Sequence, residues 1–331
     1  MNFTNKSIIL KQRPLGKVSA NCFEYQESSV RDLIEGEILV SNAYVSLDPA
    51  IRGWMNEGTT YIKGSPIGEP MRAFAIGEVV LSKNKNFEVG QIVQGLLGVQ
   101  TLAISNGQGL SKCDISQSSI SAHLGVLGMP GMTAYFGLLE RGQPKPNETV
   151  FISGAAGVVG ATAGQIAKIK GCRVVGSAGG KEKCDYLLSI GFDEVIDYKS
   201  EDLVSAIKEK IPEGISVFYD NVGGETLDAG LANLAIGARV VICGAISQYN
   251  ESSIQGPKNY MKIVTARGNM TGIIVFDFLE RYPEAVSQIS EWLLEGKLKH
   301  KEHIVEGIHN FYKALTMLFE GKNFGKLLLK L

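Results

Sequence analysis

The sequence predicts an α/β protein with two domains, a strand-rich domain and a second domain built on a doubly wound parallel sheet. Three observations lead to this prediction. Residues 1–122 hold short β-branched segments separated by Gly and Asn, with no long helical pattern. From residue 123 onward, strand and helix patterns alternate. A glycine-rich turn at 154–160, GAAGVVG, joins one strand of this series to the helix after it, as in dinucleotide-binding units.

Composition limits the function classes. The 331 residues are 44% hydrophobic and 20% charged, which is typical of a folded globular chain. The net charge of −1 gives no reason to expect a nucleic-acid or anionic-membrane partner, because both select basic surfaces. The N-terminal segment has only a three-residue apolar run, so we expect no signal peptide, and no apolar run reaches the length of a membrane span. Five widely spaced cysteines, with no CxxC pair, predict reduced thiols and a cytoplasmic location.

In the first part, the strand patterns lie at 36–48 (GEILVSNAYVSLD), at 75–82 (AIGEVVLS) and within 87–105. Residues 121–142 then show a helical pattern that Pro130 interrupts. These features predict a compact domain of short, irregularly joined strands that ends where the helical pattern starts.

In the second part, strands are expected at 148–153, 172–178, 193–198, 214–222, 238–245 and 266–277. Helices are expected at 157–171, 181–191, 200–211, 224–235 and 282–298, with Ser200 as the N-cap of the third. A further helix at 309–321 and a strand at 325–331 follow. Alternation of this kind places helices on both faces of a parallel sheet.

The turn at 154–160 is the strongest local signal for a ligand. Gly157 would let the backbone approach a pyrophosphate, and the helix N-terminus adds unpaired N–H groups and the positive end of its dipole. The spacing is GxxGxxG rather than GxGxxG, so a tight strand–helix turn without a ligand is the alternative. The strand–turn–helix context favours the cofactor interpretation, with the pyrophosphate at Ala155, Ala156, Gly157, Val158 and Val159.

The next strand indicates which dinucleotide binds. An NAD site carries an acidic residue about 20 residues beyond the glycine turn, where it binds the ribose diol. Here that position falls near Ser177, and Lys181 and Lys183 follow. Lysines pair with a 2′-phosphate, so the segment favours NADPH over NADH. A solvated helix terminus is the alternative, and Glu182 lies between the two lysines.

Several long motifs, in one order, resemble a known family. They are SLDPAIRGWM (46–55), LGMPGMTAYFGL (127–138), FYDNVGGETLD (218–228), ICGAISQYN (242–250) and GKNFGKLLLKL (321–331). The chain resembles the zinc-independent medium-chain dehydrogenases/reductases, in the branch of leukotriene hydroxydehydrogenase/prostaglandin reductase, curcumin reductase and alkenal double-bond reductase. The resemblance implies a GroES-like catalytic domain at 1–122, a Rossmann domain at 123–295 and a return to the catalytic domain at 296–331. It also implies NADPH and a homodimer built through the Rossmann domains.

The resemblance also implies site residues, each of which has an ordinary packing or turn role as its alternative. Lys183 and Tyr198 would hold the adenosine phosphate, and Asn221 lies where ligands of open sheets bind. The other cofactor contacts implied are Met129, Thr133, Cys243, Gly244, Ala245, Ile246, Ser247, Tyr249, Ile273, Val275 and Asn323. No metal is expected, because the four histidines lack Cys or carboxylate partners at zinc-site spacing.

Without a metal, the chemistry expected is hydride addition to an alkene conjugated to a carbonyl, with hydrogen-bond donors stabilising the charge on the carbonyl oxygen. The donor candidates are Tyr61 and Tyr260, which would also contact the substrate together with Pro49 and Ala50. Many members of this branch have Tyr where Ala50 stands, so the substrate class stays open. The expected function is NADPH-dependent reduction of enals and enones. The alternatives are a quinone oxidoreductase and an NADPH-binding protein without significant turnover.

Overall fold

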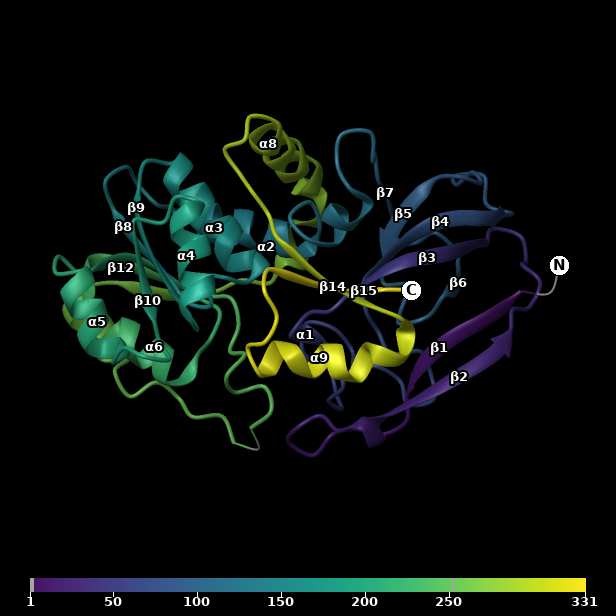
Figure 1. Ribbon diagram of the computed structural model, residues 1–331, viewed down its shortest axis with the longest axis horizontal. Helices are drawn as coiled ribbons and strands as arrows, with labels where there is room; N and C mark the ends of the chain where they lie inside the picture. Colours follow the sequence, from purple (N-terminus) through teal and green to yellow (C-terminus); the bar gives the residue numbers. More distant parts are fainter. Residues whose placement is uncertain (1–2, 252) are drawn as a thin grey trace. The chain divides into compact units, whose positions relative to one another are not determined.

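The computed structural model describes residues 3–251 and 253–331, and the chain divides into two compact units. The first unit runs up to Gly125 and includes Glu302–Leu331, and the second unit is Val126–Lys301. The borders expected from sequence, after residues 122 and 295, lie slightly before these two transitions. Figure 1 shows the strand-rich first unit in purple, blue and yellow and the α/β second unit in teal and green.

The first unit is built on a mixed seven-stranded sheet with the order β14-β15-β3-β4-β5-β7, and β6 pairs with β3. β1 and β2 form a separate antiparallel hairpin. Buried apolar residues of β3 and β4 form the centre of this unit. The strands are β1 (Thr4–Leu10), β2 (Phe23–Ser29), β3 (Ile38–Ser46), β4 (Ala75–Ser82), β5 (Ile92–Gly95), β6 (Leu102–Ser105), β7 (Ser111–Lys112), β14 (Glu302–Glu306) and β15 (Lys326–Lys330).

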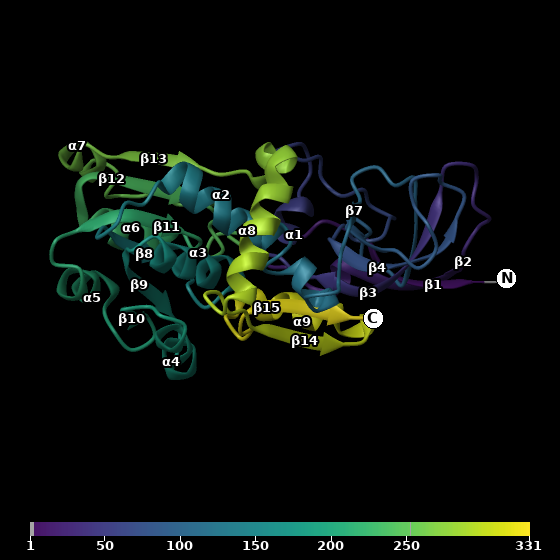
Figure 2. The same cartoon turned by 90° about the horizontal axis from the view of Figure 1, so that it is seen from above.

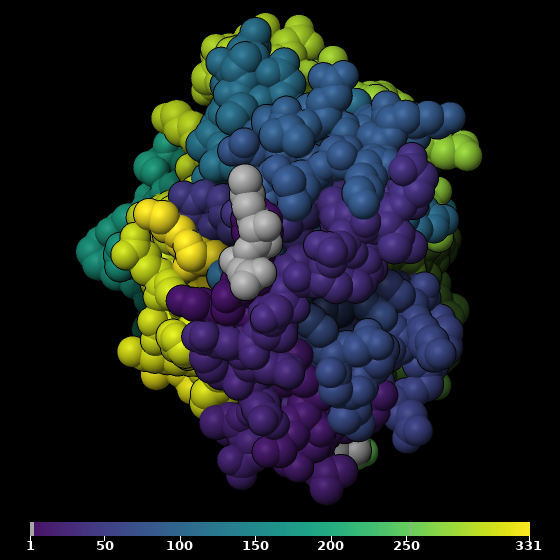
Figure 3. All heavy atoms as spheres, turned by 90° about the vertical axis from the view of Figure 1, so that its right-hand side faces the viewer, coloured from purple at the N-terminus to yellow at the C-terminus, as the bar shows by residue number. Residues whose placement is uncertain are grey.

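The C-terminal segment completes this first sheet. β15 pairs antiparallel with β3, with Leu328 opposite Ser46, and parallel with β14. Helix α9 (Phe311–Phe319) packs on the N-terminal hairpin, where the rings of Phe311 and Phe23 meet edge to face at 5.1 Å. On the surface in Figure 3, yellow C-terminal residues accordingly lie against purple N-terminal ones. Residues far apart in the sequence therefore share one core.

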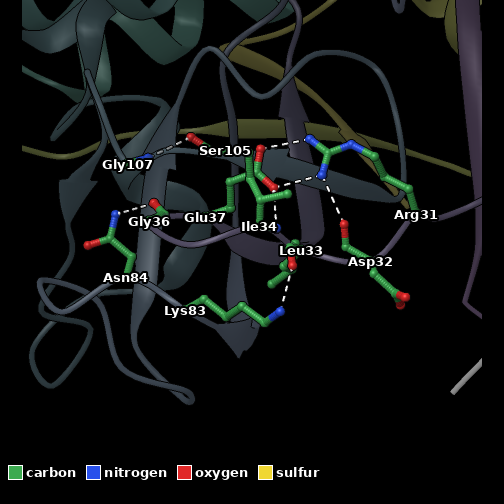
Figure 4. Close-up of polar contacts among 10 residues, drawn as sticks. All are labelled: Arg31, Asp32, Leu33, Ile34, Gly36, Glu37, Lys83, Asn84, Ser105 and Gly107. Carbon is green, nitrogen blue, oxygen red and sulfur yellow. Dashed lines mark hydrogen bonds and ion pairs between the residues drawn. The ribbon is translucent and has the colours of Figure 1, made fainter.

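A polar network fastens the loop before β3 (Figure 4). Arg31 donates two hydrogen bonds of 2.7 Å to the Glu37 carboxylate, which also accepts the Ile34 N–H at 3.0 Å. Lys83 donates to the Leu33 carbonyl oxygen at 2.7 Å. These bonds lower the pKa of Glu37 to about 2, chiefly through Arg31. The network lies at the start of β3, at the opposite end of that strand from the loop that follows it.

The second unit holds a six-stranded parallel sheet with the order β10-β9-β8-β11-β12-β13. The order reverses between β8 and β11, which is the topological switch point where open α/β sheets bind ligands. The strands are β8 (Thr149–Ile152), β9 (Arg173–Ala178), β10 (Glu194–Asp197), β11 (Ile215–Asp220), β12 (Leu234–Ile242) and β13 (Asn269–Gly272).

Helices cover both faces of this sheet (Figure 2). Neighbouring strand residues point to opposite faces, so Phe218 packs in the core cluster with Ile207 of α5 and Leu227 of α6, while the Tyr219 hydroxyl reaches α2. The helices are α2 (Met129–Phe136), α3 (Val158–Ile169), α4 (Lys181–Ser189), α5 (Leu203–Lys210), α6 (Gly224–Leu231), α7 (Lys262–Ala266) and α8 (Tyr282–Leu294). The predicted fold class is confirmed.

Some local predictions were wrong. Asp202, not Ser200, is the N-cap of α5, because its carboxylate accepts the Ser205 N–H at 2.9 Å while the Ser200 N–H is held by the Asp197 carbonyl. The strand expected over 266–277 is confined to β13 and is followed by the 3₁₀-helix at Val275–Arg281. The short helix α1 (Ala50–Trp54) and strand β14 were not predicted. Short elements carry too few residues for a periodic signal.

Candidate functional site

The turn between β8 and α3 has the geometry of a phosphate site. Gly154 has φ +58°, a conformation that glycine adopts without strain, and its carbonyl accepts the Gly157 N–H at 3.1 Å. Gly157 is the N-cap residue of α3, so the first N–H groups of that helix point out of the turn without partners inside the helix. Such groups favour an anion. We call residues 153–157, with the start of α3, the phosphate turn.

Two glycines of this turn have different reasons to be glycine. A Cβ at Gly160 would lie 2.7 Å from backbone atoms of Ala155 and Gly154, so close packing of α3 requires glycine there. A Cβ at Gly157 would meet only the Gly154 carbonyl oxygen at 3.4 Å, an ordinary contact, and its φ of −76° suits any residue. Nothing in the described chain itself excludes a side chain at Gly157. A glycine at this position would let a pyrophosphate approach the backbone, which stays a prediction.

Lys183 and Lys199 lie near the end of β9, and of these two only Lys183 was predicted from the sequence as a phosphate ligand. The pKa of Lys183 is lowered, first by burial and then by the positive charge of Lys199. A Cβ at Gly179 would lie 2.6 Å from the Tyr198 hydroxyl and 2.9 Å from Lys199 Cε, so both side chains lie against this glycine. Tyr198 and Lys199 thus lie against the end of β9, where Lys183 stands in the first turn of α4, and two positive charges at this corner would favour a bound anion.

Lys181, by contrast, points away on the exposed side of α4. Its Nζ bonds both oxygens of Asp185 at 2.9 and 2.7 Å. A role of Lys181 as a phosphate ligand stays a prediction, and Lys199 is a further lysine that lies at this corner. Sequence reasoning missed Lys199 because it follows the next strand, β10. The Asp197 carboxylate fixes this corner by accepting the N–H groups of Gly180 at 2.8 Å and Lys199 at 3.0 Å.

At the switch point, the ends of β8 and β11 are joined through Asp220, which is fully buried. Its carboxylate accepts the Ser153 hydroxyl at 2.5 Å and the N–H groups of Val222 and Gly223 at 3.1 and 2.9 Å. Burial raises the pKa of Asp220, and these three bonds oppose the rise. The Asn221 side chain donates to the Ser153 carbonyl at 2.8 Å. Asn221 therefore ties β11 to the phosphate turn, and Asp220 is the partner that sequence reasoning missed, although an Asp before glycines marks a turn.

The loop after β12, residues 243–249, is held along the end of β11. The Asp220 carbonyl accepts the Cys243 N–H at 2.8 Å, and the Val222 carbonyl accepts the Ser247 N–H and hydroxyl at 3.1 and 2.7 Å. The Tyr249 hydroxyl accepts the Ala245 N–H at 3.2 Å. A Cβ at Gly244 would lie 2.9 Å from that hydroxyl. The loop lies at the carboxyl ends of the strands, as a cofactor-covering segment must.

Tyr219 connects two residues that were predicted to flank the nicotinamide. Its hydroxyl donates to the Thr133 carbonyl at 2.8 Å, and Thr133 Oγ1 in turn donates to the Met129 carbonyl at 2.8 Å. Burial raises the pKa of the neighbouring Cys243 thiol to about 12, and the Tyr219 hydroxyl opposes the rise. Cys243 is therefore a neutral thiol at pH 7 and not a thiolate nucleophile. Tyr219 was missed because it reads as an ordinary strand aromatic.

The remaining predicted cofactor residues lie at element ends. Ile273 is buried just beyond β13 and donates its N–H to the Ile242 carbonyl at 3.2 Å. Val275 is buried at the start of the 3₁₀-helix. Asn323, in the first unit, donates to the Gly325 carbonyl at 3.1 Å. Whether it also reaches a cofactor stays a prediction.

In the first unit, the loop after β3 leads directly into α1. Pro49 is the N-cap residue and Ala50 the first helical residue. From the end of this helix, the indole N–H of Trp54 donates to the Tyr61 hydroxyl at 3.0 Å. Burial raises the pKa of Tyr61, and the Trp54 bond opposes the rise. Tyr61 thus stays a neutral phenol at pH 7, with 46% of the residue exposed.

Tyr260 belongs to the second unit, in the turn that opens α7, and its carbonyl accepts the Ile263 N–H at 3.1 Å. It is 56% exposed. The two tyrosine candidates therefore come from different units, and their shared role stays a prediction. Within residues 3–251 and 253–331, no three His, Cys, Asp or Glu side chains cluster as metal ligands, so these residues do not fit a zinc site. Over the same residues, no helix has the length and apolarity of a membrane span.

Comparison with known proteins agrees with this geometry. Residues 6–113 match a family described as the N-terminal domain of oxidoreductase, and residues 158–291 match one described as zinc-binding dehydrogenase. The chain is 38% identical to an NADPH-dependent curcumin reductase of Escherichia coli, over 98% of this chain and 96% of that protein. It is 39% identical to a 2-alkenal reductase (NADP⁺-dependent) of tobacco, again over 98% and 96%.

The structure of CurA from Vibrio vulnificus in complex with NADPH superposes with a TM-score of 0.93, at 41% identity and 98% coverage of both chains. The chain belongs to the zinc-independent medium-chain dehydrogenases/reductases. The resemblance drawn from the sequence motifs is confirmed. Although the second family is described by zinc, the described part of this medium-chain reductase offers no ligand set for that metal.

Proposed function

We propose that this protein is an NADPH-dependent reductase of carbon–carbon double bonds conjugated to an aldehyde or ketone. Relatives that match nearly the whole chain are named for such reactions, including a curcumin reductase, a 2-alkenal reductase and a (+)-pulegone reductase. One observation in the structure carries the cofactor assignment. It is the meeting of Lys199, which lies against Gly179 at the end of β9, with Lys183 in the first turn of α4, whose pKa the charge of Lys199 lowers after burial.

The residues of the second unit would hold NADPH in order along the switch point. The phosphate turn would bind the pyrophosphate, while Lys183, Lys199 and Tyr198 would bind the 2′-phosphate. Asn221 and the loop 243–249 would cover the middle of the cofactor. Met129, Thr133, Ile273 and Val275 would contact the nicotinamide, and Asn323 would reach it from the first unit.

NADPH, when bound, supplies a hydride for the β-carbon of the alkene. The task of the chain is to stabilise the negative charge that develops on the carbonyl oxygen. Tyr61 is suited to donate a hydrogen bond there, because burial keeps its phenol protonated and Trp54 orients the oxygen. Tyr260 is the second donor candidate. Pro49 and Ala50 would contact the substrate, and the small Ala50 leaves room for bulky substituents.

The experiment that tests this function offers a substrate panel to the purified protein. It measures NADPH and NADH oxidation with a 2-alkenal, an aryl enone, a quinone and a saturated aldehyde, and identifies products by mass. We expect saturated carbonyl products from the alkenal or the enone, with NADPH preferred. Turnover of the quinone alone would replace this proposal by a quinone reductase. Tight NADPH binding without turnover of any compound would indicate a binding protein.

We also propose a homodimer through the edge of the second sheet. β13 stands at the end of the strand order, pairs with β12, and presents Met270 as an exposed apolar residue. Exposed Met261 and Val264 lie at the adjoining α7. Exposed apolar edge strands are normally covered, and a second copy is the simplest cover. Sedimentation of the wild type and of Met270→Lys tests this, since an unchanged dimer in the variant would contradict the edge interface.

We place the enzyme in the cytoplasm, on the basis of its five free cysteines. Fractionation of cells that express the tagged chain tests this location. Recovery in a secreted or membrane fraction would contradict it.

A further inference from the structure

Lys326 is a deeply buried charged residue that the proposed chemistry does not use. Its side chain is 2% exposed, and lysine is almost never buried to this degree unless it is paired. Its Nζ lies 2.7 Å from Asp48 Oδ1, on a carboxylate that is 8% exposed. The same Nζ donates to the Leu47 carbonyl at 3.2 Å. The pair joins β15 to the loop that precedes Pro49 and Ala50.

The strand register places Lys326 at this loop. β15 runs antiparallel to β3 with Leu328 opposite Ser46, so Lys326 extends past the end of β3. The backbone continues the pairing there, because the Leu47 N–H donates to the Leu327 carbonyl at 3.1 Å. A Cβ at Gly125 would lie 3.4 Å from Lys326 Cγ, so the lysine stem packs under this glycine. The ammonium group is thereby directed at Asp48.

Asp48 connects Lys326 to the loop that carries Pro49 and Ala50, the proposed substrate contacts. Its second carboxylate oxygen accepts the Ser46 hydroxyl, and its carbonyl accepts the Ile51 N–H at 3.0 Å, which opens α1. The last residue of α1 is Trp54, whose indole N–H holds the Tyr61 hydroxyl. A continuous set of contacts therefore runs from Lys326 through Asp48 and α1 to Tyr61.

Stability alone is a weak reason for such a pair. Burying two charges costs desolvation that their attraction barely offsets, and apolar residues often stabilise a core as well. On the same strand, Lys330 forms an exposed ion pair with Glu306 at 3.3 Å, which serves as a comparison for the buried pair. The buried pair can instead fix the position at which α1 begins relative to the sheet. A hydrogen-bonded ion pair requires a defined geometry, whereas an apolar contact does not.

We infer that Lys326 is a positioning residue for the substrate, acting through Asp48 to hold Pro49, Ala50 and Tyr61 where the unsaturated carbonyl binds. This inference rests on the proposed reductase function. The charge of Asp48 also contributes to the raised pKa of Tyr61, after burial, which agrees with the two groups lying close together.

The test compares Lys326→Met, which keeps most of the unbranched side chain and removes its charge, with Lys330→Met on the same strand. For Lys326→Met we expect the KM for the enone to rise about tenfold or more, since small displacements of positioning groups have large kinetic effects. The Kd for NADPH, measured by cofactor fluorescence, should stay within about twofold. Lys330→Met should change neither constant. Lys326→Arg should recover part of the loss by restoring a cation.

Hydrogen–deuterium exchange gives a readout that does not depend on activity. In Lys326→Met, the amides of residues 49–61 should exchange about tenfold faster, and those of the phosphate turn should not change. If Lys326→Met does not fold, Asp48→Asn combined with Lys326→Met removes both charges and is measured in the same way. Wild-type values for the enone KM and for exchange at 49–61 would overturn the inference. So would equal weakening of enone and NADPH binding, which marks general destabilisation. A wild-type protein that reduces no enone would refute the proposed function alone, since exchange still tests the anchoring.

Discussion

The phosphate turn of the second unit and the segment 47–61 of the first unit, here called the Asp48 loop, are held in place by different kinds of chemical group. The phosphate turn consists of backbone groups, with glycines at 154, 157 and 160 and the N–H groups that start α3. The Asp48 loop is shaped by side chains, chiefly Lys326, Asp48, Trp54 and Tyr61. The first is local in sequence, while the second joins residues 278 positions apart.

This difference matches the two kinds of ligand that are expected at the two sites. A phosphate group is the same in every dinucleotide, so backbone N–H groups serve it, and few sequences give that geometry. Substrates differ among enzymes, so side chains carry the selection. Ala50 lies in that loop directly after Pro49, next to the Asp48–Lys326 pair, which is buried.

The largest effect should follow from filling the phosphate turn. Gly157→Val should raise the Kd for NADPH about a hundredfold, or about 2.7 kcal/mol, because its side chain takes the space of the pyrophosphate. The melting temperature should fall only modestly, since an added Cβ makes an ordinary contact there, although Val is a poorer N-cap than Gly. Fluorescence titration and thermal melting measure the two quantities.

Gly160→Ala provides the contrast, because its Cβ would meet backbone at 2.7 Å and should lower the melting temperature. Gly53→Ala, in open space in the other unit, is the control for both quantities. If Gly157→Val bound NADPH as the wild type does, the phosphate turn would not be the cofactor site.

A smaller and selective effect should come from the lysines. Lys183→Ala should raise the KM for NADPH about tenfold to a hundredfold and leave NADH kinetics nearly unchanged, because one charged hydrogen bond to the 2′-phosphate is lost. Lys199→Ala should act in the same direction. Lys181→Ala is the matched control, since that lysine is paired with Asp185 on the same helix. Equal losses with both cofactors would contradict the assignment.

The smallest effect concerns the Arg31–Glu37 network, which lies on the surface of the first unit. The pKa of Glu37 is lowered from 4.5 to about 2, so its contribution to stability is present above about pH 4.5 and is lost as the pH falls towards 2. Glu37→Gln should therefore melt slightly below the wild type at pH 7, with unchanged kinetics. The two melting temperatures should converge as the pH falls to about 2. A difference that grows with acid would contradict this linkage.

Sequence patterns predicted the features that are local along the chain. The alternation of strands and helices and the glycine-rich turn come from short, contiguous signals, and the site role of Lys183, which stays a prediction, rests on a signal of the same kind. Lys199, Tyr219 and Asp220 were missed because their importance arises only when separate strand ends meet. Ser200 was chosen as a helix cap because its type suits a cap, but Asp202 competes for the same role two residues later.

The sheet order of the first unit has a consequence for synthesis of the protein. β15 lies between β14 and β3, inside the sheet, so residues 326–330 must leave the ribosome before the Tyr44–Ser46 stretch of β3 gains its partner on that side. All of the second unit, Val126–Lys301, is made before that moment. The nascent second unit is therefore free to fold first. Until β15 is made, the first sheet is incomplete, because Tyr44–Ser46 of β3 lack their partner on one side. During this interval, at about 5–20 residues per second, the chain is most exposed to aggregation and most in need of a chaperone.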